Sequence, residues 1–145
     1  MNLRQFVSLL AIVAVVWFAR SGAAQNQERY KARLTTVPMD GGMRNTVAGS
    51  GSATASLAGT TLAITGTFEG LRSPATAASL HNGVAKGVRG LSVAELTVTR
   101  TTKGTLTGSI NLTPEQVKGL REGRLYIELA SEKAPEGNLW GWLLK

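Results

Sequence analysis

Cysteine is absent from this chain of 145 residues, and histidine occurs once, at position 81. Without cysteine the protein can form no disulfide, carry no lipid on a cysteine after a leader segment, and offer no thiolate to a metal. A catalytic zinc needs three protein ligands, and a copper site needs several imidazoles or soft sulfurs. We therefore expect no metal and no cofactor.

Acidic residues are also few, with nine against 16 basic residues. They form no paired constellation of the kind that acid–base catalysis requires, and structural ion pairs explain them more simply. The basic excess predicts attraction to anionic partners such as acidic glycans. Because the basic residues are scattered and are not interleaved with aromatic ones, we expect no binding of nucleic acid.

The first 24 residues have the order of a secretory signal peptide. Arg4 precedes an apolar run at 6–19, which is followed by Ser21-Gly22-Ala23-Ala24. As a helix, this run would span about 21 Å, which is short of the roughly 30 Å core of a membrane, although retention as an anchor is the alternative. Export without disulfides is common in bacterial envelopes, so we expect a bacterial periplasmic or extracellular protein with no transmembrane segment after cleavage.

Residues 25–145 are enough for one domain, and they read as a series of short strands. Segments of Thr, Val, Ile and Leu with alternating polarity are separated by Gly, Ser, Pro and Asn. The predicted strands are Glu28–Thr36, Gly51–Leu57, Thr61–Phe68, Ala77–His81, Val93–Arg100, Thr105–Leu112, Arg124–Ala130 and Asn138–Leu144. This spacing predicts an all-β fold, a single Greek-key β-sandwich or flattened barrel of about eight strands.

One short helix interrupts the strands. Thr113 is a suitable N-cap, Pro114 a suitable first helical residue, and Gln116 completes a capping box. We expect this helix to cover one end of the sheets with Val117 and Leu120 facing inward. A turn is predicted at 134–137, where proline and glycine precede the last strand.

The chain resembles the CHRD domain, a module named for its occurrence in chordin and widespread in exported bacterial proteins. The likeness covers nearly all of residues 25–145. It rests on the order and spacing of several segments, namely Tyr30-Lys31-Ala32-Arg33-Leu34, Phe68-Glu69-Gly70-Leu71, Ala78-Ser79-Leu80-His81-Asn82-Gly83, Leu112-Thr113-Pro114-Glu115-Gln116 and Pro135-Glu136-Gly137-Asn138-Leu139-Trp140-Gly141-Trp142-Leu143. The third is similar to the family's Ala-His-Ile-His-x-Gly, and the last to its Pro-x-Gly-Glu-Ile-Arg-Gly-Gln-Leu.

Several departures from the family pattern bear on function. Ser79 stands where the family has its first histidine, and Ala130 stands where a further histidine is common. The glutamate and arginine of the last motif become Asn138 and Trp140. Because most of the family's histidine cluster is lost, no metal-binding role is carried over. The resemblance implies a non-enzymatic exported module.

His81 remains the one candidate centre of a polar site, together with Ser79, Asn82 and Arg89. An imidazole near neutrality can act as a general base, and Ser79 is the nearest hydroxyl. The alternative is a hydrogen-bonded histidine at a strand end with no chemical role. We predict no catalytic residue.

Trp140 and Trp142 share one face of the last strand, whereas Leu139 and Leu143 occupy the other. A strand that is apolar on both sides is either enclosed in the core or covered by a partner. Tryptophan suits both situations, so core packing and an interface or glycan-stacking surface both stay open.

We therefore expect an exported, non-enzymatic binding or structural module of the cell envelope or extracellular space. Its partner would be a protein or an anionic glycan, and the sequence leaves the ligand and the oligomeric state open. One alternative is an anionic-polymer binder that uses the basic N-terminal strand, with Arg29, Lys31, Arg33 and Arg44. The other is a degenerate metal- or enzyme-like site around His81.

Overall fold

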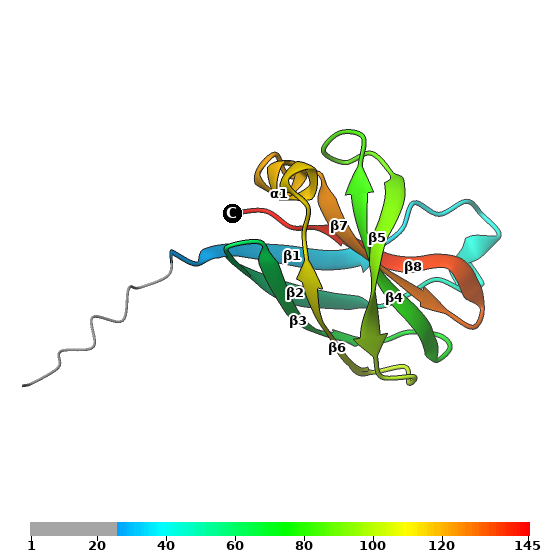
Figure 1. Cartoon of the computed structure of the whole chain (residues 1–145). Helices are drawn as coiled ribbons and strands as arrows, with labels where there is room; N and C mark the ends of the chain where they lie inside the picture. Colours follow the sequence, from blue (N-terminus) through cyan, green and yellow to red (C-terminus); the bar gives the residue numbers. More distant parts are fainter. Residues whose placement is uncertain (1–25) are drawn as a thin grey trace, which may run out of the picture.

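The structure is a computed structural model that describes residues 26–145 (Figure 1). Eight antiparallel strands and two short helices follow one another as β1 (Glu28–Thr36), η1 (Met43–Asn45), β2 (Ser50–Ala58), β3 (Thr61–Glu69), β4 (Ala75–Gly83), β5 (Gly90–Val98), β6 (Gly104–Asn111), α1 (Pro114–Arg121), β7 (Leu125–Ser131) and β8 (Ala134–Trp142). The expected signal peptide lies outside the described residues. Within residues 26–145, no helix is long and apolar enough to cross a membrane.

The strands close into a barrel in the order β1-β2-β3-β6-β5-β4-β7-β8, with β8 returning to β1. Neighbours such as β3 with β6 and β4 with β7 are not consecutive, so the chain crosses between the two halves of the barrel. The predicted fold class is confirmed: residues 26–145 are all-β, with eight strands and one short α-helix.

Alternating side chains divide the inside of the barrel from its outside. In β1, Tyr30, Ala32 and Leu34 are buried, whereas Arg29 and Lys31 are exposed. The same alternation buries the apolar positions of β3 and β7, because successive residues of a strand point to opposite faces. One hydrophobic core fills the barrel. The residues between the buried positions of each strand point outward and form the outer faces, where a site can lie.

The helix α1 forms as its capping residues predict. The Thr113 hydroxyl accepts a hydrogen bond from the Gln116 amide (3.3 Å), and the Gln116 side-chain oxygen accepts one from the Thr113 amide (2.9 Å). Leu120 is fully buried and Val117 is nearly so, and the helix packs against β4 and β7. It therefore covers one end of the barrel (Figure 1).

The predicted turn at 134–137 is wrong, because these residues form the first part of β8. The hairpin turns earlier, at Glu132 and Lys133. The register between β7 and β8 shifts between Leu129 and Ser131, so that extra residues of β8, including Pro135, bulge out of the ladder. A bulge accommodates a proline that could not donate within a regular ladder.

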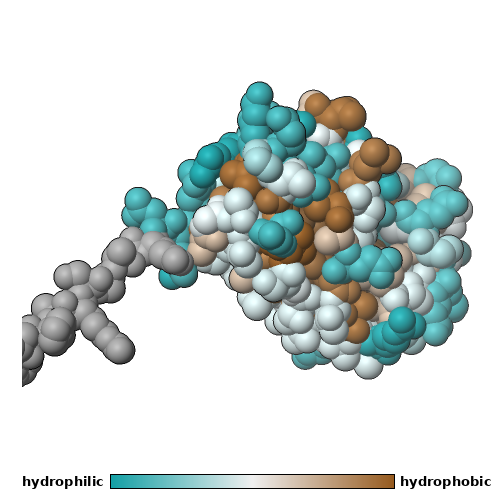
Figure 2. Space-filling view, in the orientation of Figure 1, coloured by the Kyte–Doolittle hydropathy of each residue, from teal (hydrophilic) through white to brown (hydrophobic). Residues whose placement is uncertain are grey.

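Two joins of the barrel have short ladders. The strands β8 and β1 pair only at Thr35 and Thr36, with a further bridge at Lys31. The strands β5 and β6 pair only at Thr97 with Thr107 and at Val98 with Leu106, whereas β3 and β6 pair over the full length of β6. Half-buried Val93 and Ile110 pack against the core beside this seam. Figure 2 shows apolar side chains reaching the surface across the middle of this view, where β5 and β6 part. The seam between β5 and β6 is thus one of two short joins in the barrel.

Candidate functional site

The strands β4, β7 and β8 lie side by side and carry a cluster of large side chains on the outside of the barrel. Cross-strand pairing sets His81, Tyr126 and Trp142 in one row. The next row holds Ser79, Glu128 and Trp140. We call these six residues, together with Arg89 from the β4–β5 loop, the aromatic face. The members of the face come from segments that are far apart in the sequence. The pairing register of β4, β7 and β8 brings them together.

The rings of the aromatic face stack on one another. The centre of the Tyr126 ring lies 4.9 Å from that of His81, with 17° between the planes, and 4.9 Å from that of Trp142. Trp140 meets Trp142 edge to face at 4.7 Å. Each such pair contributes about 0.5–1.5 kcal/mol beyond the area that it buries. Tyr126 is only 1% exposed although it lies outside the barrel, so the stack is a rigid element of the surface.

Arg89 closes one side of the stack. It donates a hydrogen bond to the Glu128 carboxylate at 3.0 Å, and its guanidinium carbon lies 4.9 Å from the centre of the Trp140 ring. The Arg89 side chain is 51% exposed, so the ion pair itself adds little to stability. The ion pair with Glu128 instead positions the Arg89 guanidinium over the Trp140 ring at the surface.

The His81 ring is fixed by two hydrogen bonds. Its Nδ1 lies 3.2 Å from the carbonyl oxygen of Gly90, and its Nε2 lies 2.8 Å from the Ser79 hydroxyl. A carbonyl only accepts, so Nδ1 carries the proton and the Ser79 hydroxyl donates to Nε2. In the neutral imidazole, these two contacts correspond to the single tautomer with its proton on Nδ1.

This pair resembles a nucleophile and its base, but its surroundings do not fit hydrolysis. The third partner of His81 is a neutral carbonyl where a triad has a carboxylate. Ser79 lies in the middle of β4, where it pairs with Glu95 of β5 and with Glu128 of β7. The backbone amides next to Ser79 are therefore used in hydrogen bonds between the strands. A strand interior supplies no free amides to stabilise an oxyanion. The two hydrogen bonds of His81 hold its ring in place beside Tyr126.

Of the four residues grouped around His81 from the sequence, the structure brings Ser79, His81 and Arg89 together and leaves Asn82 apart. The Asn82 side-chain oxygen is buried without a hydrogen-bond partner in the described part of the chain. This oxygen faces Gly119 of α1, so closely that a side-chain Cβ at position 119 would lie 2.9 Å from the oxygen. Asn82 therefore belongs to the contact between β4 and the helix.

Two residues of the aromatic face, Tyr126 and Glu128, were not singled out from the sequence. The available signal was the alternation of β7, where Leu125, Ile127 and Leu129 fill the core and leave the residues between them outside. For Trp140 and Trp142 the sequence left core packing and an interface open. Both side chains lie outside the barrel and are half-buried. Trp140 meets Trp142 edge to face and also packs against a small hydrophobic cluster of Val37, Val47 and Ala134.

The family model of the CHRD domain matches residues 30–143. This chain belongs to the CHRD domain family. No curated protein and no solved structure matches the chain. Several departures of this CHRD domain from the family pattern point to the same side of the sheet as the aromatic face. They are Ser79 of β4, Ala130 of β7 and Trp140 of β8. Three of the four departures thus share one face, whereas the fourth, Asn138, is fully buried and donates a hydrogen bond to Ser131.

The part of the chain that the structure describes holds no cluster of metal-ligating side chains in place of the family's histidines. Among residues 26–145, no three His, Cys, Asp or Glu side chains lie close enough together to hold an ion. The carboxylate nearest to the His81 pair along β7, Glu128, is engaged by Arg89. This donor set does not suit zinc or copper.

A second cluster ties the start of the barrel to its end. Arg121 of α1 and Lys145 both contact the carboxylate of Glu28, at 2.6 and 3.3 Å, and the Tyr30 hydroxyl donates to it. The Arg121 and Tyr30 hydrogen bonds lower the pKa of Glu28 to about 2. Burial, together with the Glu28 carboxylate, raises the pKa of Tyr30 to about 12. The cluster joins β1, α1 and the C-terminus.

Proposed function

We propose that this chain is an exported, non-enzymatic binding module that docks onto a protein partner through its aromatic face. Residues 1–24 serve as the export signal in this proposal. The observation that carries it is the fixed stack of His81, Tyr126 and Trp142, with Arg89 and Trp140 beside it on the outer surface.

The composition of the face supports a protein partner. Tryptophan, tyrosine and arginine are the residues most enriched at the energetic centres of protein interfaces. Because the rings are already packed in one arrangement, binding would immobilise few new side chains. Ser79, His81 and Glu128 supply polar atoms beside the rings, which suits the hydrogen bonds of an interface.

The geometry around Ser79 and His81 supports the non-enzymatic part of the proposal. A hydrolase would require a carboxylate or comparable group behind the imidazole and amide donors in front of the hydroxyl. A mid-strand serine whose histidine is bound to a carbonyl supplies neither.

Site-specific photocrosslinking tests the proposal. A benzophenone amino acid replaces Trp140 in one variant and Thr102, an exposed residue of the β5–β6 turn, in the control. In cells that make the protein, we expect discrete protease-sensitive adducts from position 140 and none from position 102. Equal adducts at both positions, no adduct at position 140, or an adduct that resists protease would overturn the proposal of a protein partner.

A further inference from the structure

The outer face of β1, β2, β3 and β6 carries small hydroxyl side chains in register. Three cross-strand rows each begin at a basic residue of β1. The rows are Arg33, Ser52, Thr67 and Thr105; then Lys31, Thr54, Thr65 and Thr107; then Arg29, Ser56, Ala63 and Ser109. Neighbouring strands lie about 4.8 Å apart, and successive rows about 6.7 Å apart, which makes a regular grid of hydrogen-bonding groups. We call it the hydroxyl grid.

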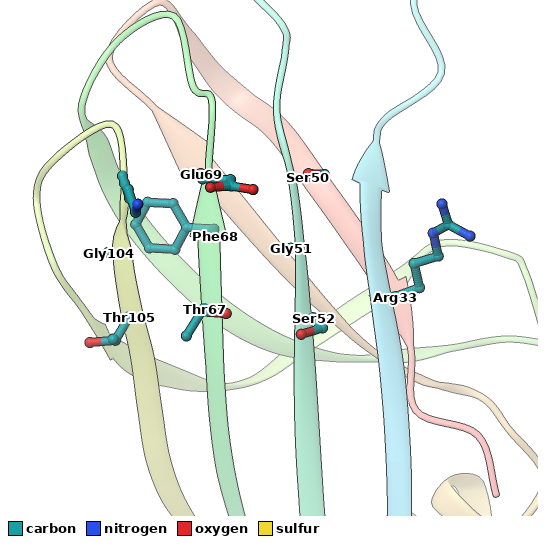
Figure 3. Close-up of a pocket in the computed structure, with 10 residues that line it drawn as sticks. Arg33, Ser50, Gly51, Ser52, Thr67, Phe68, Glu69, Gly104 and Thr105 are labelled. Atoms are coloured by element: carbon teal, nitrogen blue, oxygen red, sulfur yellow. The ribbon is translucent and has the colours of Figure 1, made fainter.

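A groove runs over this grid because its side chains are short. Its largest part has a volume of about 800 Å³ and is lined by Ser52, Thr67 and Thr105, with Arg33 at the β1 margin (Figure 3). The groove continues over the middle row as a hollow of about 400 Å³ that shares these three hydroxyl residues. A third hollow of about 320 Å³ reaches Arg29 and Lys31. The groove therefore spans the hydroxyl rows and meets all three basic side chains.

The charges beside the groove are not neutralised. Within residues 26–145, no carboxylate lies within ion-pair distance of Arg29, Lys31 or Arg33, since the four ion pairs of this region involve other basic residues. Residues 1–25 contain no acidic residue. Lys103 adds a further positive charge at the groove, and Glu69 is its one acidic lining residue. The groove thus has a net positive rim.

We propose that this groove binds a linear anionic glycan. Its carboxylate or sulfate groups pair with Arg29, Lys31 and Arg33, which point outward along one edge of the groove. Its sugar hydroxyls exchange hydrogen bonds with the serine and threonine rows, which both donate and accept. Arg44 takes no part, because it lies in η1 and outside the rows.

The chemistry of the grid favours a glycan over other polyanions. Single-stranded nucleic acid is held by aromatic platforms on which its bases stack. Here the aromatic residues of the same strands, Tyr30 and Phe68, are each 2% exposed and face the core. A polyanion without hydroxyls can accept hydrogen bonds from the rows but has none to donate, so it would use only their donor capacity. A ligand that carries both anionic and hydroxyl groups uses the basic side chains and both the donor and the acceptor capacity of the rows.

The first experiment removes charge. The full chain is titrated with polygalacturonate and with heparin, with neutral dextran as a blank, for the wild type and for the variant R29Q/K31Q/R33Q. The matched control R44Q/K118Q/K133Q removes the same charge from exposed positions outside the groove. We expect affinity to fall about tenfold or more in the first variant and to change less than about twofold in the control, since exposed charges act locally in physiological salt. An equal loss in both variants would overturn the proposal.

The second experiment keeps the charge and removes hydroxyls. The variant T54V/T65V/T107V preserves shape and strand propensity but leaves the middle row without donors or acceptors. We expect the glycan that bound in the first experiment to lose more affinity than polyphosphate, because the glycan both donates to and accepts from the rows whereas polyphosphate only accepts. Should the triple variant fail to fold, T65V alone makes the same comparison. Unaltered glycan binding, or polyphosphate or single-stranded DNA binding as tightly as the glycan, would show general electrostatic attraction and overturn the proposal.

Discussion

Tyr126 and His81 stack outside the barrel, with their ring centres 4.9 Å apart. The two residues lie directly opposite one another on β7 and β4. The tyrosine hydroxyl forms hydrogen bonds with the amide and the carbonyl oxygen of Gly90, and the same carbonyl oxygen accepts a hydrogen bond from the imidazole Nδ1. A single glycine at the start of β5 thus forms hydrogen bonds with both rings and holds them next to each other.

Tyr126 is therefore expected to behave in mutagenesis like a core residue. Tyr126→Ala should lower the free energy of unfolding by about 3–5 kcal/mol, the range for removing a buried aromatic ring. Tyr126→Phe keeps the stack and loses only the contacts with Gly90, which should cost about 0.5–1.5 kcal/mol. Urea unfolding followed by tryptophan fluorescence measures both. Similar losses in the two variants would show that the ring itself contributes little.

The hydrogen bonds of His81 predict a single tautomer. Nitrogen chemical shifts of the imidazole at pH 8 should show a protonated Nδ1 and an unprotonated Nε2, because Gly90 offers only a carbonyl and Ser79 a hydroxyl. Ser79→Ala removes the donor to Nε2, so the Nε2 resonance should move while the Nδ1 resonance stays. A wild-type spectrum with the proton on Nε2 would contradict the assigned network.

The Glu28 cluster predicts a pH dependence of stability. The folded protein holds the pKa of Glu28 at about 2, below its ordinary value of 4.5. Its contribution is therefore fully present above about pH 4.5 and is lost as the pH falls toward 2. Glu28→Gln should reduce stability at pH 7 and flatten the decline between pH 4.5 and 2. Glu136→Gln, an exposed residue of β8, is the control and should reproduce the wild-type curve.

Much of the fold could be predicted because the deciding signals were local. The alternation of Tyr30, Ala32 and Leu34 gave the bounds of β1, and the capping box at Thr113 and Gln116 gave the start of α1. The start of β8 could not be predicted, since it depends on a register shift against β7. Local propensity at Pro135 indicates a turn, and only the partner strand converts it into a bulge.

The candidate site divides in the same way. Ser79 and His81 could be paired because they lie two residues apart on one strand. Tyr126 and Glu128 could not be added, since the placement of β7 between β4 and β8 is a property of the barrel order. The hydroxyl grid has the same origin: its rows come from four strands, and no single strand shows that its serines and threonines align.

The seam between β5 and β6 should be the first part of the barrel to open. On its β6 side, β5 has partners only at Thr97 and Val98, so its segment 91–95 is held by β4 alone. Strands held on one side open at lower free energy than strands held on both. In native-state hydrogen exchange, we expect the amides of 91–95 to be protected at least about 100-fold less than those of β3, which is paired along both edges. Equal protection of the two segments would mean that the barrel opens only as a whole. The helix α1 covers one end of the barrel but not this seam, and Leu91 beside the seam is already 85% exposed. Opening of the seam would therefore admit solvent to the core at this point first.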